Sequence, residues 1–263
     1  MQLTNEELKD LEKKSVSLIN KAGKIILDSW KNIGEIKYKD ERDIATSVDI
    51  EVENFLRVNL NTYFPKAGFI VEEGESNETN DYNWIIDPIE GTKYYAGSVP
   101  MFFTQFALLY KREPILGVIF NPSSNQIFSA SLGNGSNLNG IKITPRQCID
   151  PSKAIIDYDF ATLSGSSDLK LSIFNILVKN FYRVRLTAGF LQPYLLTGGI
   201  DAIIAFQKER SSNPIKYLID DAPKFILFKE AGFILEEITL QNVKITVVSS
   251  PEIINHIKNI LTP

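Results

Sequence analysis

Short apolar segments separated by turn residues dominate the chain between residues 69 and 143. Runs of this kind, bounded by Gly, Pro and Asn, predict β-strands, and the tight connections between them predict antiparallel hairpins. The predicted strands are 69–71, 84–86, 102–110, 115–120, 126–130 and 141–143. This part of the chain therefore predicts a sheet whose strands are mostly antiparallel.

Segments with helical spacing of apolar residues lie on either side of these strands in the sequence. Thr4 and Glu7 form a capping-box pattern before a long amphipathic helix that runs to Trp30, and 50–60 predicts a second helix. After Asp150-Pro151 the predicted strands are 154–158, 182–186, 202–206 and 245–249, and the predicted helices are 169–179, 190–197, 221–231 and 252–261. This mixture predicts a layered α/β (α+β) fold, as one domain with lobes at about 1–150 and 151–263.

The charge and the rare residue types exclude several classes of function. A net charge of −4 gives no reason to expect a nucleic acid polymer or an anionic membrane as partner, and acids interrupt the basic stretch 37–42, which predicts a solvated loop. No apolar run approaches the ~20 residues that a membrane span needs. The single Cys148 excludes an intrachain disulfide, and the single His256 argues against catalytic triads and zinc–histidine sites. Because the first residues lack a signal-peptide pattern, we expect a cytoplasmic protein.

The segment Trp84–Thr92 carries the strongest chemical signal. Asp87 and Glu90 follow an apolar strand three positions apart, with Pro88 between them, and Gly91-Thr92 then offers a free N–H and a hydroxyl at a predicted helix start. Hard divalent cations prefer oxygen ligands and often bind beside a phosphate. The segment therefore predicts a metal and phosphate site, although Asp-Pro and Glu-Gly are also ordinary turn dipeptides.

Four further acids stand at the ends of predicted elements. Asp43 and Asp49 precede the second helix, Glu72 leaves a strand, and Asp220 comes directly before the predicted helix 221–231. Taken singly, Asp49 and Asp220 suit helix capping, and Glu72 suits a solvated loop. Taken together with Asp87 and Glu90, they predict one shared site.

In this order the acids resemble those of the inositol monophosphatase superfamily, which includes fructose-1,6-bisphosphatase and 3′(2′),5′-bisphosphate nucleotidase. The likeness runs over nearly the whole chain. The segments similar to family motifs are 43–49, 69–73, 84–92, 139–140, 197–202 and 220–232. The resemblance implies an αβαβα sandwich, a lithium-sensitive and Mg²⁺-dependent phosphatase, a homodimer, and a small phosphorylated metabolite as substrate.

The resemblance also assigns roles to individual positions. It implies that two or three Mg²⁺ ions are held by Glu72, Asp87, Glu90, Asp220 and the Ile89 carbonyl. It implies that Asp49 and Thr92, together with Glu72, orient and activate the attacking water. It places Gly91, Thr92, Asp220 and Lys93 on the phosphate and substrate side. Clustered carboxylates repel one another unless cations neutralise them, so the assignment is physically consistent.

The chain departs from the family pattern at several positions. Glu90 stands where most members have Asp, Val71 where they have Gly, and Ile219 where Trp precedes the late Asp. Ala205 occupies the position of a Glu that contacts a ring hydroxyl in the inositol phosphatases. The predicted loop 206–219 carries Lys208, Arg210 and Lys216, which suit either a second phosphate or a solvated surface.

Two functional hypotheses follow. The first is Mg²⁺-dependent hydrolysis of a small phosphate monoester, with inositol monophosphate or 3′-phosphoadenosine 5′-phosphate foremost; Lys93 favours the second because the bisphosphate nucleotidases carry Gly-Thr-Lys. The alternative is a degenerate relative that binds a phosphorylated ligand or a partner protein without hydrolysis, which Glu90 and Ile219 motivate.

Overall fold

The computed structural model describes residues 2–30, 32–39, 44–146, 150–159, 166–206 and 214–262, with the backbone alone for 214–218. The chain forms two compact units: unit 1 is Met1–Lys142 with Pro214–Glu230, and unit 2 is Ile143–Asn213 with Ala231–Pro263. Helix α5 (Pro214–Glu230) thus belongs to unit 1, whereas the sequence suggested one division near residue 150. That the units are lobes of one phosphatase domain stays a prediction.

Unit 1 is built on a seven-stranded sheet with strand order β3-β4-β5-β6-β7-β8-β9. The strands are β3 (Gly68–Val71), β4 (Tyr82–Glu90), β5 (Phe103–Tyr110), β6 (Glu113–Asn121), β7 (Gln126–Ser131), β8 (Gly135–Leu138) and β9 (Ile141–Lys142). Only the β3–β4 pair is parallel, so the predicted antiparallel hairpins are confirmed. A separate two-stranded sheet joins β1 (Ile36–Tyr38) to β2 (Ile44–Thr46).

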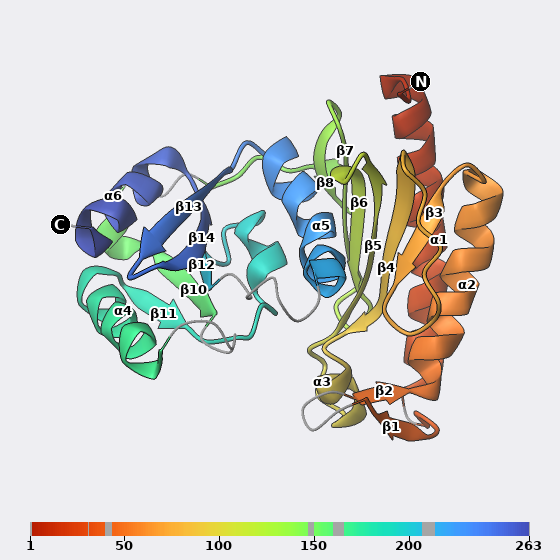
Figure 1. The fold of residues 1–263 in the computed structure, drawn as a ribbon, viewed down its shortest axis with the longest axis horizontal. Coiled ribbons are helices and arrows are strands. Elements are labelled where there is room, and N and C mark those ends of the chain that lie inside the picture. Colours follow the sequence, from red (N-terminus) through yellow and green to blue (C-terminus); the bar gives the residue numbers. More distant parts are fainter. Residues whose placement is uncertain are drawn as a thin grey trace. The chain divides into compact units, whose positions relative to one another are not determined.

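Helices cover both faces of the seven-stranded sheet (Figure 1). The helices α1 (Asn5–Ser29) and α2 (Ser47–Tyr63) lie on one face, and α5 lies on the other. The capping box predicted for Thr4 and Glu7 is present at the start of α1. Unit 1 is therefore a three-layer α-β-α arrangement.

The alternation of side chains along β4 decides which face receives the functional acids. Trp84 and Ile86 point into the core beneath α1 and α2, whereas Ile85 packs against α5 through Ile219 and Ala222. Because side chains two apart in a strand share a face, Asp87 lies on the α5 side with Ile85. This register brings Asp87 to the helix that carries Asp220.

Helix α5 lies close against the sheet because Gly117 on β6 has no side chain. A Cβ added at Gly117 would stand 2.7 Å from the Pro223 carbonyl oxygen and 2.5 Å from Ile226 Cγ2. Any larger residue there would push the helix away from the strand. The small residue thus sets the height at which α5 holds its acids above the sheet.

Unit 2 contains a five-stranded mixed sheet with strand order β11-β10-β12-β14-β13. Its strands are β10 (Ile155–Asp159), β11 (Arg183–Arg185), β12 (Ala202–Phe206), β13 (Ile234–Leu240) and β14 (Val243–Ser249). Helices α4 (Ser167–Asn180) and α6 (Pro251–Leu261) pack on it through one apolar core, and the 3-10 turn η1 (Pro151–Lys153) precedes β10. Both units mix helices and sheets, so the predicted α+β class is confirmed.

Several element boundaries were predicted wrongly. Strand β4 does not end at Ile86 but continues through Asp87-Pro88 to Glu90. Helix α5 begins at Pro214, so part of the predicted loop 206–219 is helical. Only the 3-10 turn η2 (Gln192–Leu195) forms where a helix over 190–197 was expected, and β8 and β13 were missed. No helix in the described part of the chain combines the length and apolar character of a membrane span.

Candidate metal and phosphate site

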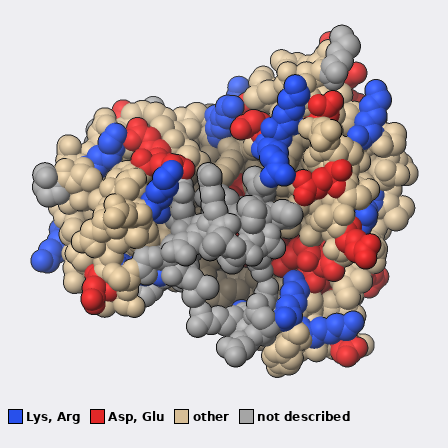
Figure 2. Space-filling view, viewed as in Figure 1, with Lys and Arg blue, Asp and Glu red and all other residues tan. Residues whose placement is uncertain are grey.

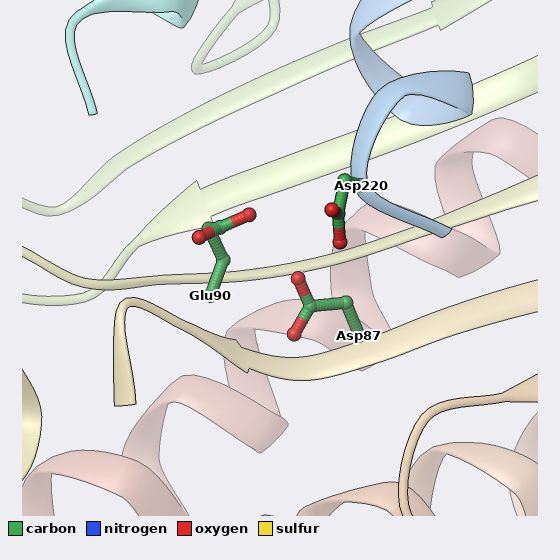
Figure 3. A group of neighbouring side chains, drawn as sticks. All are labelled: Asp87, Glu90 and Asp220. Carbon is green, nitrogen blue, oxygen red and sulfur yellow. The ribbon is translucent and has the colours of Figure 1, made fainter. Parts of the chain in front are cut away.

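Three carboxylates from two distant parts of the sequence meet beside the seven-stranded sheet. Asp87 and Glu90 come from the end of β4, and Asp220 comes from α5. Each offers a carboxylate oxygen, and these three oxygens all lie within 4.8 Å of one another. Figure 3 shows the three side chains pointing toward a common centre. We call Asp87, Glu90 and Asp220 the carboxylate cluster.

A bulge in β4 places Glu90 in this cluster. Residues three apart on a regular strand face opposite sides of a sheet. Asp87 pairs with Gln105 and Glu90 with Phe103, so three steps on β4 face two steps on β5 and β4 holds one extra residue. Such a bulge re-aims the side chains beyond it. Glu90 therefore returns to the side of Asp87.

The buried, negatively charged environment of Asp87 favours the binding of a cation. Burial raises the pKa of Asp87 well above its ordinary value, and the charges of Glu72, Glu90 and Asp220 raise it further. Its Oδ2 accepts a hydrogen bond of 2.9 Å from Gln105 Nε2, whereas its buried Oδ1 has no hydrogen-bond partner among the described residues. A buried carboxylate oxygen without a partner is costly. A site made of carboxylate oxygens alone fits a hard divalent cation such as Mg²⁺.

Asp220 lies within α5 and not before its first turn. The helix starts at Pro214, so the expectation that Asp220 caps a helix N-terminus is wrong. The helical spacing of Ile215, Leu218, Ile219 and Ala222 could have indicated the earlier start. Gly232, with a φ of +89°, follows the end of α5, where a glycine in the left-handed conformation commonly ends a helix.

Glu72 lies outside the carboxylate cluster and bonds a lysine. Its Oε1 is 3.0 Å from Lys39 Nζ, and Lys39 also pairs with Glu73. Lys39 belongs to the stretch that was expected to be a solvated loop. The charge of Glu72 nevertheless contributes to the raised pKa of Asp87. The role of Glu72 as a metal ligand stays a prediction.

Asp49 and Thr92 meet beneath the end of β4. Thr92 Oγ1 lies 3.2 Å from Asp49 Oδ1 and 2.8 Å from the Ile89 carbonyl oxygen. The other carboxylate oxygen of Asp49 accepts a 2.8 Å hydrogen bond from the Thr46 N–H, which closes the capping box of α2. Asp49 is buried, and burial raises its pKa despite these hydrogen bonds. The residue therefore both caps a helix and bonds Thr92.

Gly91 starts the short helix α3 (Thr92–Ala96) in a conformation that other residues rarely adopt. Its φ is +87°, and an added Cβ would stand 2.8 Å from the Met101 carbonyl oxygen. The Gly91 carbonyl accepts the N–H groups of Tyr94 and Tyr95, so the preceding N–H groups lie outside the helical hydrogen bonds. Lys93 is exposed on this helix.

Several positions named in the sequence analysis lie outside the part of the chain that the structure describes. Asp43, Cys148, Lys208 and Arg210 lie outside the described residues, as does the side chain of Lys216. Ala205 lies on β12 of unit 2.

Sequence reasoning missed three polar contacts of this site, made by Gln105, Lys39 and Lys224. Gln105 bonds Asp87, Lys39 bonds Glu72, and Lys224 lies 3.7 Å from Asp221. The position of Gln105 opposite Asp87 was recoverable only with the strand register. The spacing of Lys224 four residues after Asp220 was visible, since residues at this spacing share a helix face.

Comparison with known proteins agrees with this architecture. The model of the inositol monophosphatase family matches residues 7–249. Inositol monophosphatase 2 of Saccharomyces cerevisiae is 33% identical over 158 residues, which are 57% of this chain and 54% of that protein, so the match spans about half of the relative. Fructose-1,6-bisphosphatase/inositol-1-monophosphatase of Thermotoga maritima is 26% identical over 227 residues, 83% of this chain and 81% of that protein.

The fold agrees with solved structures as well. The extragenic suppressor protein suhB from Bartonella henselae superposes with a TM-score of 0.82 at 21% identity, over 95% of this chain and 97% of that one. This likeness concerns the fold alone and confirms the predicted architecture.

Proposed function

The chain belongs to the inositol monophosphatase family, and on that premise we propose that it is a metal-dependent phosphatase that hydrolyses a small phosphate monoester. One observation carries the proposal: Asp87, Glu90 and Asp220 converge although twelve other helices, turns and strands of the described chain lie between β4 and α5. Three carboxylates held this close repel one another and gain most from cations.

Asp87, Glu90 and Asp220 would hold Mg²⁺ through their carboxylate oxygens, with the Ile89 carbonyl and Glu72 as further ligands. We propose that the site binds two or three Mg²⁺ ions, the number that the family resemblance implies. Bound Mg²⁺ would supply positive charge to the phosphate and lower the pKa of water. Positioning and charge stabilisation carry most of phosphoryl transfer, so a site without histidine is adequate.

Asp49 and Thr92 would orient the attacking water. Thr92 Oγ1 carries one proton and has two acceptors in reach, Asp49 Oδ1 at 3.2 Å and the Ile89 carbonyl oxygen at 2.8 Å. The lone pairs of the same oxygen remain able to accept a proton from water. A hydroxyl that donates to a buried carboxylate can therefore accept from a water at the same time.

The phosphate would lie at the start of α3. The N–H groups of Gly91 and Thr92 stand outside the helical hydrogen bonds, and Gly91 adopts the left-handed conformation that a glycine allows. Asp220 and the exposed Lys93 would face the substrate beyond the phosphate.

Inositol monophosphate and 3′-phosphoadenosine 5′-phosphate are the substrates we propose to test first. Ala205 in place of a glutamate weakens the case for an inositol ring, and Lys93 favours a second phosphate. We do not propose the non-hydrolysing alternative. It was based mainly on Glu90 standing where the family has Asp, and the bulge in β4 brings Glu90 into the carboxylate cluster.

Phosphate release from a panel of these esters, with Mg²⁺ and with EDTA, tests the proposal. We expect release with Mg²⁺ only, inhibition by Li⁺, and loss of at least a thousandfold in kcat for Asp87→Asn with unchanged circular dichroism. Asp81→Asn, at an exposed position just before β4, is the matched control and should keep full activity. Folded wild-type protein that releases phosphate from no ester would reject the proposal.

A homodimer and a cytoplasmic location are further proposals from the family resemblance. Light scattering of the purified protein tests the first, and a mass equal to one chain would reject it. The face in Figure 2 shows acidic and basic side chains interspersed among its described residues, in keeping with a partner other than nucleic acid.

A further inference from the structure

Lys224 is a buried lysine on the helix that supplies Asp220 to the carboxylate cluster. It lies on α5 one turn after Asp220, so that the two side chains are about 40° apart around the helix. Ile219 and Ala222 face the sheet, which puts Asp220 and Lys224 on the same flank of α5. The Lys224 side chain is only 8% exposed, unlike Lys229 further along the helix.

A lysine buried to this extent needs negative partners. Lys224 Nζ lies 3.7 Å from Asp221 Oδ1, a distance too long for a strong hydrogen bond. Burial alone would lower the pKa of Lys224, but the charges of Asp221, Glu90, Asp220 and Asp87 outweigh burial and raise it. The ammonium group therefore stays charged and is attracted by the cluster as well as by Asp221.

We propose that Lys224 is a resident cation of the carboxylate cluster, which offsets part of its negative charge in the metal-free protein and weakens its binding of divalent cations. The inference rests on the proposed function only in taking the cluster as the metal site. Three carboxylates carry a charge of about −3 when ionised, and one ammonium reduces this to about −2. Such a site needs fewer Mg²⁺ ions than its acids alone indicate.

The alternative is that Lys224 only forms an ion pair with Asp221. The two hypotheses differ in what removal of each partner does to Mg²⁺. If Lys224 neutralises the cluster, Lys224→Met tightens Mg²⁺ binding and Asp221→Asn does not, because the lysine remains. If the Asp221 pair is its whole role, Lys224→Met leaves Mg²⁺ binding unchanged.

The experiment compares wild type, Lys224→Met, Lys224→Arg and the control Lys229→Met after removal of metal with EDTA. Titration calorimetry with Mg²⁺ gives the Kd and the number of ions, and thermal unfolding in EDTA gives the stability of the metal-free fold. We expect Lys224→Met to bind Mg²⁺ about tenfold tighter or to bind one more ion, since a nearby charge changes affinity on this order. We also expect a lower unfolding midpoint in EDTA, whereas Lys224→Arg should resemble wild type.

Equal Mg²⁺ affinity and stoichiometry in Lys224→Met and Lys229→Met would overturn the proposal. Should Lys224→Met fail to fold, Lys224→Met/Glu90→Gln decides: recovery of folding in EDTA supports a charge role, and continued failure assigns Lys224 to packing and overturns the proposal. These measurements use no substrate, so absent phosphatase activity in wild type would reject the proposed function without deciding the role of Lys224.

Discussion

The hydroxyl of Thr92 lies 3.2 Å from the carboxylate of Asp49, although 43 positions separate the two residues in the chain. Asp49 belongs to the first turn of α2, and Thr92 is the first residue of α3. The contact joins the helix that leads into the sheet to the segment that leaves β4. It places a buried hydrogen-bond acceptor directly behind the candidate phosphate site.

Removing this hydroxyl should impair catalysis more than folding. For Thr92→Val we expect kcat to fall by about a hundredfold or more, because the oxygen that orients the water is lost while the volume is kept. The free energy of unfolding should fall by about 1 kcal/mol for the lost hydrogen bonds. Steady-state kinetics and denaturant unfolding measure the two effects. Thr62→Val, which removes an exposed α2 hydroxyl bonded to the Asn59 carbonyl, is the control, and equal kcat in both variants would contradict the role of Thr92.

Glu90→Asp tests whether the bulge in β4 requires the longer glutamate side chain at position 90. The backbone at Glu90 is set by the extra residue between Asp87 and Glu90, so a carboxylate one methylene shorter should fall short of the cluster. Mg²⁺ tolerates little error in ligand distance. We expect Mg²⁺ affinity and kcat/KM to fall by about tenfold. A gain in rate would indicate instead that the site has decayed from an aspartate ancestor.

Gly91→Ala should destabilise the protein and displace α3. The substitution adds left-handed backbone strain and a clash with the Met101 carbonyl oxygen at 2.8 Å, together on the order of 2–3 kcal/mol. Gly140→Ala is the matched control, because its φ is also positive at +78° but nothing lies within 4 Å of an added Cβ. Thermal unfolding of both variants isolates the clash. A difference of zero between them would show that the backbone near Met101 gives way.

The raised pKa of Asp87 predicts how metal-free stability depends on pH. The folded protein favours protonated Asp87, so this stabilisation is complete below the pKa of the unfolded chain and is lost as pH rises through the folded pKa. In EDTA, the wild type should therefore lose stability relative to Asp87→Asn as pH rises above about 4, the ordinary pKa of an aspartate. Saturating Mg²⁺ should oppose this trend, because the ion binds the ionised carboxylate. Unfolding midpoints across pH measure both, and parallel curves in EDTA would contradict the prediction.

Local features of the fold could be predicted from neighbouring residues. The capping box of Thr4 and Glu7, the apolar spacing of α1 and the hairpin at Asn139-Gly140 each depend on residues within one turn of chain. Their free energies are decided by short-range sterics and hydrogen bonds. The same holds for Gly91, whose need for a positive φ follows from the turn into α3.

The sequence indicated which acids to expect in the candidate site, but it did not indicate which other side chains contact them. Asp87, Glu90 and Asp220 were expected together because their spacing resembles a family, and Asp49 was paired with Thr92 for the same reason. The hydrogen bond from Gln105, the pairing of Lys39 with Glu72, and the burial of Lys224 depend on strand register and helix packing. These are contacts between distant segments, which no local pattern encodes.

The amino-acid sequence by itself determined the mixture of helices and antiparallel strands, because periodicity and turn chemistry act over a few residues. It also supplied the order of acids that resembles the family's. Tertiary structure alone decided that β4 runs past Pro88 with one extra residue, that Asp220 lies inside α5, and that Lys224 is buried. The physical reason is that a bulge, a helix start and a buried charge are stabilised by partners across the sheet. Those partners exist only once the chain has folded.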